Sequence, residues 1–125
     1  MTNTRIERLE QIIVDNPNDT FALFALAKEF EKEGELARSS QLFERLIVAD
    51  QDYIGAYYHL GKVYEQSEEI KKALNIYEAG ISIAKKLNDM HALGELKNAK
   101  MNLLIWKFED VFKNSSYNVA YCYWV

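Results

Sequence analysis

Residues 55–66 read GAYYHLGKVYEQ, and this stretch has the spacing of one face of an α-helix. Tyr57, Leu60, Gly61 and Tyr64 follow one another at intervals of three, one and three residues, so a helix places them on a single stripe. Charged and polar residues lie off that stripe. A glycine inside a helix costs about 1 kcal/mol relative to alanine. Gly61 therefore indicates that another part of the chain packs closely against this face.

The same pattern occurs 34 residues earlier in the chain. The segment that begins FALFALAKEF at Phe21 aligns with the segment that begins GAYYHLGKVY at Gly55, and residue size and polarity agree along both. Each segment holds two amphipathic stretches separated by a short polar break, which predicts one helical hairpin per unit. A fixed period of this length predicts a repeat architecture.

This unit resembles the tetratricopeptide repeat, a 34-residue helical hairpin with large and small residues at fixed places. The second unit has Tyr57, Leu60, Gly61, Tyr64, Ala73, Tyr77 and Gly80 at those places, and the first has Leu23, Leu26, Ala27, Phe30, Ser39, Phe43 and Leu46. Ser39 and Leu46 depart from the small residues that the family has there. The resemblance implies that the two helices of a unit pack through small residues, with Gly61 facing Ala73.

The fold class expected from the repeat is all-α, with antiparallel helical hairpins stacked as a short right-handed α-solenoid of about six helices. A single domain is expected over residues 1–125. Its predicted parts are a half repeat (5–19), a first repeat (20–53), a second repeat (54–87), a degenerate capping helix (88–113) and an aromatic C-terminal segment (114–125).

Composition and charge limit the classes of partner and compartment. A net charge of -4 and a pI near 5.2 disfavour general binding to nucleic acid or to anionic membranes. No apolar run reaches the ~18 residues of a membrane span, and the polar start has no apolar leader. The single cysteine, Cys122, cannot form an internal disulfide. We expect a cytoplasmic protein.

Motifs that would support catalysis or cofactor binding are lacking in the sequence. His59 and His91 do not have the spacing of paired metal ligands, and neither a nucleophile elbow nor a glycine-rich phosphate loop occurs. Cys122 has no base near it in the sequence. The sequence therefore predicts a protein that is not an enzyme and that holds no metal and no cofactor.

A concave groove is the predicted binding surface. Stacked hairpins line an extended concave face with the first helix of each unit, and residues one place beyond the packing stripe should point into it. These are Phe24, Lys28, Glu31, Tyr58, His59, Lys62, Glu65 and Asn98. The expected ligand is a peptide or helix of a partner protein. In the alternative interpretation, the aromatic residues pack between hairpins while the charged residues pair along the surface.

The last residues, NSSYNVAYCYWV, are too apolar for a solvated end. Three interpretations stay open: the segment folds back over the last helix, it pairs with another subunit, or it has little role. Residues of this segment and of the last helix are candidates for an oligomer interface; they are Trp106, Tyr117, Tyr121, Tyr123 and Trp124. Self-assembly, for example as a homodimer, is thus the alternative function.

Overall fold

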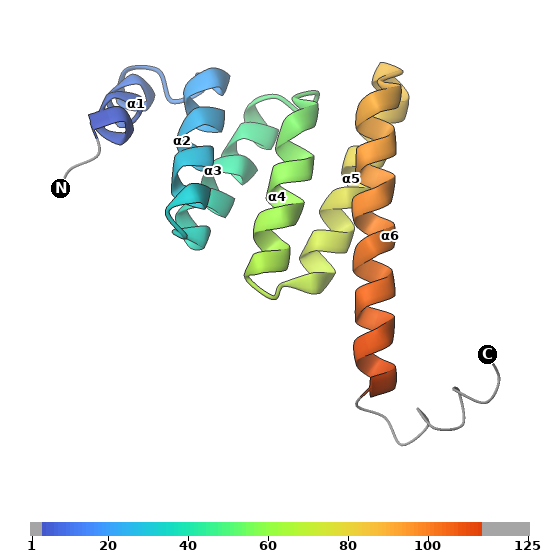
Figure 1. Ribbon diagram of the computed structural model, residues 1–125. Helices are drawn as coiled ribbons and strands as arrows, with labels where there is room; N and C mark the ends of the chain where they lie inside the picture. The colour runs from blue at the N-terminus through green and yellow to red at the C-terminus, as the bar shows by residue number, and fades with distance from the viewer. Residues whose placement is uncertain (1–3, 114–125) are drawn as a thin grey trace.

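The computed structural model describes residues 4–113, with the side chains of residues 4–107. Six helices joined by short turns make up this part of the chain (Figure 1). They are α1 (Thr4–Asp15), α2 (Thr20–Lys32), α3 (Leu36–Ala49), α4 (Ile54–Gln66), α5 (Ile70–Leu87) and α6 (Met90–Lys113). The predicted all-α fold and its number of helices are confirmed for the described residues. The predicted aromatic segment 114–125 lies outside them.

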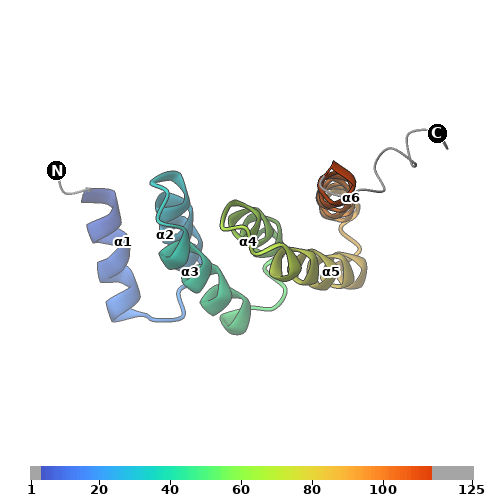
Figure 2. The same cartoon turned by 90° about the horizontal axis from the view of Figure 1, so that it is seen from below.

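The helices form two layers. The first helices of the units, α2 and α4, lie in one layer with α6, whereas α3 and α5 lie in the other (Figure 2). Each helix packs mainly on its neighbours in the chain: α2 on α3, α3 on α4, α4 on α5 and α5 on α6. The helices that carry the predicted groove residues, α2, α4 and α6, therefore lie in the same layer.

Three helices end in the same kind of turn. Gly34, Glu68 and Asn88 follow α2, α4 and α5 with positive φ angles of 78°, 59° and 56°. After α2, the amide of Glu35 donates to the carbonyl of Phe30 at 2.9 Å, which closes a Schellman motif. Glu68 occupies the same place as Gly34 one repeat later, although this backbone conformation favours glycine. The repeats thus share turn geometry even where the residue differs.

Gly61 makes room for an aromatic ring of α5. A Cβ atom built at Gly61 would meet the ring of Tyr77, which is fully buried. The structure corrects the predicted partner, because Tyr77 and not Ala73 fills the space left by the missing side chain. Tyr77 lies one turn after Ala73, and long side chains on a helix lean back toward its N-terminus. The Tyr77 hydroxyl also donates to the carboxylate of Glu65 on α4.

The departure at Ser39 has a local explanation. Ser39 is fully buried between α2 and α3, where the second repeat has Ala73. Its hydroxyl donates to the backbone carbonyl of Ala27 at 2.8 Å. The polar atom is therefore satisfied, and a serine fits at a place where the family has a small apolar residue.

The last helix packs with one stripe and extends beyond the hairpins. Leu93, Leu96, Ala99 and Leu103 are buried, while Lys97, which aligns with Gly61, is exposed. At 24 residues α6 is the longest helix, and its far end projects past the level at which α4 turns into α5 (Figure 1). The prediction of a long, atypical last helix agrees with this geometry.

Candidate protein-binding surface

Two clusters, on α2 and on α4, contain seven of the eight predicted groove residues. Phe24, Lys28 and Glu31 come from α2, and Tyr58, His59, Lys62 and Glu65 come from α4; all seven side chains are half-buried. Asn98 on α6 is exposed and, among the described residues, makes no side-chain hydrogen bond with the other seven. The structure therefore groups the residues by hairpin and leaves Asn98 apart.

Phe24 lies at the joint between the two hairpins. Its ring centroid is 5.3 Å from that of Tyr53, 5.5 Å from that of His59 and 5.9 Å from that of Phe43. Sequence reasoning does not assign Tyr53 or Phe43 to this surface. Phe24 thus packs between hairpins, as in the alternative interpretation, and also remains partly open to solvent on the side of the α2–α4 layer.

His59 joins the aromatic cluster to a pair of charges on α2. Its ring stacks on Phe43 with centroids 6.0 Å apart. Its Nδ1 lies 3.4 Å from Nζ of Lys28 and 3.9 Å from a carboxylate oxygen of Glu31. Burial, together with the neighbouring Lys28 ammonium, lowers the pKa of His59 from its ordinary value of 6.5 to about 4. At neutral pH the ring is uncharged and accepts from Lys28.

Glu31 is less well satisfied than its equivalent in the second repeat. Its Oε2 is buried and has no hydrogen-bond partner among the described residues. Burial raises the pKa of Glu31, and the nearby Lys28 charge opposes this shift. Glu65 at the equivalent place receives the hydroxyl of Tyr77, but the residue equivalent to Tyr77 is Phe43, which has no hydroxyl. The missing hydroxyl of Phe43 therefore explains why the Glu31 carboxylate lacks the hydrogen bond that Glu65 receives.

Lys62 is the cation of the cluster on α4, and its side chain is half-buried. Its Nζ lies 5.5 Å from the centroid of the Tyr58 ring and 3.6 Å from a carboxylate oxygen of Glu65. These distances exceed those of a direct charged hydrogen bond. The ammonium is therefore held loosely and can turn to another anion without losing a strong contact.

One charged residue of this layer, Glu95 on α6, is not among the residues predicted from the sequence. Glu95 aligns with His59 when α6 is matched to α4 at a shift of 36 residues, and its charge acts on His59 by raising the pKa of that ring. The signal was available in the sequence, since Leu93 and Leu96 set the register of α6. The α2–α4–α6 layer thus carries both charge signs.

Two further findings concern the described residues. No group of three or more His, Cys, Asp or Glu side chains in this part of the chain is arranged to hold a metal ion. Within the same residues, none of the helices combines the length and the apolar character of a membrane span. Trp106 is 55% exposed on α6, whereas the other interface candidates, Tyr117, Tyr121, Tyr123 and Trp124, lie outside the described residues.

Comparison with known proteins gives the family. No family model and no curated protein matches the sequence. The solution structure of a tetratricopeptide repeat domain protein from Salinibacter ruber matches with 40% identity and a TM-score of 0.66, over 70% of this chain and 89% of that one. A crystal structure of such a protein from the same organism has 40% identity and a TM-score of 0.64, over 68% and 96% of the two chains.

The chain belongs to the tetratricopeptide repeat family. A third match is the TPR2B domain of yeast Sti1 in a complex with pHsp70, which is 15% identical with a TM-score of 0.75 over 81% of each chain. At that identity the likeness concerns the fold alone. In this small tetratricopeptide repeat protein, α2 and α4 are the first helices of two complete repeats, and the clusters around Phe24 and Tyr58 occupy equivalent places in them.

Proposed function

We propose that this tetratricopeptide repeat protein is a protein-interaction module whose α2–α4–α6 layer binds an extended peptide or a helix of a partner protein. The observation that carries the proposal is the recurrence of an aromatic residue, a lysine and a glutamate at 34-residue spacing on α2 and α4. Their side chains remain half-exposed on one layer. The proposal assigns binding to this surface and no catalytic step.

The expected ligand combines apolar side chains with a carboxylate. Tyr58 and Phe24 offer ring surface that remains partly accessible. The ammonium groups of Lys28 and Lys62 lie 3.4 Å and 3.6 Å from their polar neighbours, so a ligand carboxylate can compete for either. Aromatic anchors beside an accessible charge are typical of binding surfaces. The Sti1 domain in its complex shows that a related fold accommodates a partner.

The test is a comparison of wild-type protein with a Tyr58→Ala/Lys62→Glu variant. Affinity capture identifies a partner, and calorimetry with the purified partner then measures both affinities. We expect the variant to bind at least about tenfold more weakly, which corresponds to about 1.4 kcal/mol. A matched control is Lys71→Glu, which makes the same charge change at an exposed position on α5. Equal affinity of the folded double variant and the wild type would contradict the proposal.

A further inference from the structure

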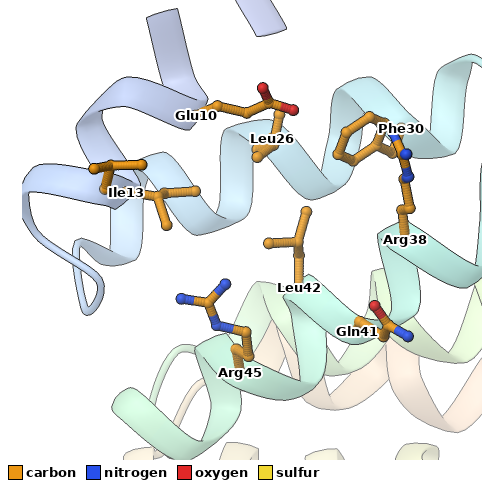
Figure 3. Close-up of a pocket in the computed structure, with 9 residues that line it drawn as sticks. Glu10, Ile13, Leu26, Phe30, Arg38, Gln41, Leu42 and Arg45 are labelled. Atoms are coloured by element: carbon orange, nitrogen blue, oxygen red, sulfur yellow. The ribbon is translucent and has the colours of Figure 1, made fainter. Parts of the chain in front are cut away.

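A second hollow lies between α1 and α3, with α2 as its floor. It has a volume of about 460 Å³, and its floor is formed by the largely buried side chains of Leu26 and Phe30 from α2, with Leu42 from α3 beside them. Side chains from all three helices surround it (Figure 3). The rim contains Arg38 and Arg45 of α3. This hollow is distinct from the α2–α4 clusters and belongs to the opposite side of α2.

The corresponding hollow of the next repeat has a similar volume, about 440 Å³, but its lining contains a polar link. Glu44, Tyr64 and Lys72 line it, and they align with Glu10, Phe30 and Arg38 at the 34-residue shift. The Tyr64 hydroxyl donates to the carboxylate of Glu44. Phe30 has no hydroxyl for Glu10, so this bond is lost in the first hollow. Because Phe30 lacks the hydroxyl of Tyr64, the first hollow has an apolar floor where the next repeat has a polar link.

The α3 side of the first hollow suits carboxylates, whereas the α1 side carries the acidic Glu10. Arg38 and Arg45 are exposed and seven residues apart, which is about 10 Å along the helix. Arg38 lies 5.4 Å from the centroid of the Phe30 ring, and Arg45 donates to the carbonyl of Pro17 at 3.3 Å. A guanidinium has five N–H donors, so both retain donors for an incoming acid. At the places of these arginines the second repeat has Lys72 and Ala79.

The chain itself contains a segment of matching chemistry toward the far end of α6. Trp106 is 55% exposed there. In the sequence, Glu109 and Asp110 follow it at three and four residues, which is the spacing of neighbours on a helix. An indole buries about 150–250 Å² on contact. The sequence of this segment therefore combines one large apolar residue with two acidic residues, as the hollow and its arginines require.

We propose that the end of α6 of a second copy docks into the α1–α3 hollow, with Trp106 on the apolar floor and the acidic sequence that follows it next to Arg38 and Arg45. Within one chain the hollow and the end of α6 lie at opposite ends of the helix stack (Figure 1). The contact therefore joins different copies. Because the two surfaces differ, each copy can bind one neighbour at each end, and the assembly grows as an open chain.

The test measures mass against concentration for the full chain by sedimentation velocity, up to about 1 mM. We expect the average mass to rise beyond two chains. Trp106→Glu and Arg38→Glu/Arg45→Glu each should weaken association at least about tenfold, and added salt should weaken it as well. Lys72→Glu changes the equivalent hollow and is the matched control, with association as in the wild type. Circular dichroism verifies that every variant is folded.

Mixing the two disabled variants separates this proposal from a symmetric dimer. The Trp106→Glu copy keeps an intact hollow, and the Arg38→Glu/Arg45→Glu copy keeps an intact α6. We expect the mixture to form a 1:1 pair that does not grow further. A wild-type protein that stays monomeric over the whole concentration range overturns the proposal. Association that stops at two chains and ignores the arginine substitutions also overturns it, and both results leave the groove on α2 and α4 untouched.

Discussion

Replacing Gly61 by alanine should destabilise the protein, although alanine is the better helix former. The added methyl group would enter the space of the Tyr77 ring, whose atoms are the nearest neighbours of that position. Tyr77 is fully buried and its hydroxyl is bonded to Glu65, so the ring cannot move aside freely. Overpacking a core costs roughly 1–3 kcal/mol, and the gain in helix propensity is about 1 kcal/mol. Because the ring atoms lie closer to the built Cβ atom than van der Waals contact allows, the cost should fall in the upper half of that range, about 2–3 kcal/mol. Subtracting the gain of about 1 kcal/mol leaves a net loss of about 1–2 kcal/mol.

Urea unfolding followed by circular dichroism measures this loss as a lower midpoint with an unchanged slope. The first repeat supplies the comparison, since Ala27 and Phe43 occupy the equivalent places and Phe43 lacks the hydroxyl. In a Tyr77→Phe background the ring is no longer tied to Glu65, so Gly61→Ala should cost less. The coupling energy between the two substitutions should reach at least about 0.5 kcal/mol.

Two results would refute this reasoning. A Gly61→Ala protein that is as stable as the wild type would show that the Tyr77 ring has room for a methyl group. An equal cost of Gly61→Ala in the wild-type and Tyr77→Phe backgrounds would show that the bond to Glu65 does not hold the ring in place.

The remaining predictions concern a turn and a histidine. Glu68→Gly should raise the free energy of unfolding by about 0.5–1 kcal/mol, because residue 68 has a positive φ angle that costs residues other than glycine about 1–2 kcal/mol. Thermal melts measure this gain, and Gly34→Ala, measured beside it, should destabilise the protein. The neutral form of His59 is favoured in the folded state, so the unfolded chain takes up the proton first as the pH falls below 6.5. The contribution of neutral His59 to the free energy of unfolding, at most about 3 kcal/mol, is fully present above pH 6.5 and is lost as the pH falls toward 4. His59→Gln should flatten the pH dependence between these values, and an unchanged dependence would contradict the assignment.

The helices and most of their buried faces could be predicted because the spacing of residues encodes a helix face directly. Tyr57, Leu60, Gly61 and Tyr64 form one stripe in the sequence, and all four are buried. The 34-residue period then indicates which helices pair. These properties depend on residue type and distance along the chain, both of which the sequence contains.

Contacts across the hairpins were less predictable because they depend on the angle at which the units stack. The predicted groove residue Phe24 packs against Tyr53 from the turn between α3 and α4, and no periodicity connects these two positions. The apolar floor of the α1–α3 hollow likewise depends on a difference between Phe30 and Tyr64 that leaves the helix pattern unchanged. The available signal in the sequence is the exchange of tyrosine for phenylalanine at aligned places of the two repeats, which removes one hydroxyl.

The length of α6 fixes where the chain leaves the repeat stack. This helix has 24 residues where α4 has 13, a difference of 11, or about 16 Å at roughly 1.5 Å per residue. A continuous helix over that distance is a stiff lever. Force applied at its far end is therefore transmitted as torque to the buried stripe that contains Leu96 and Leu103.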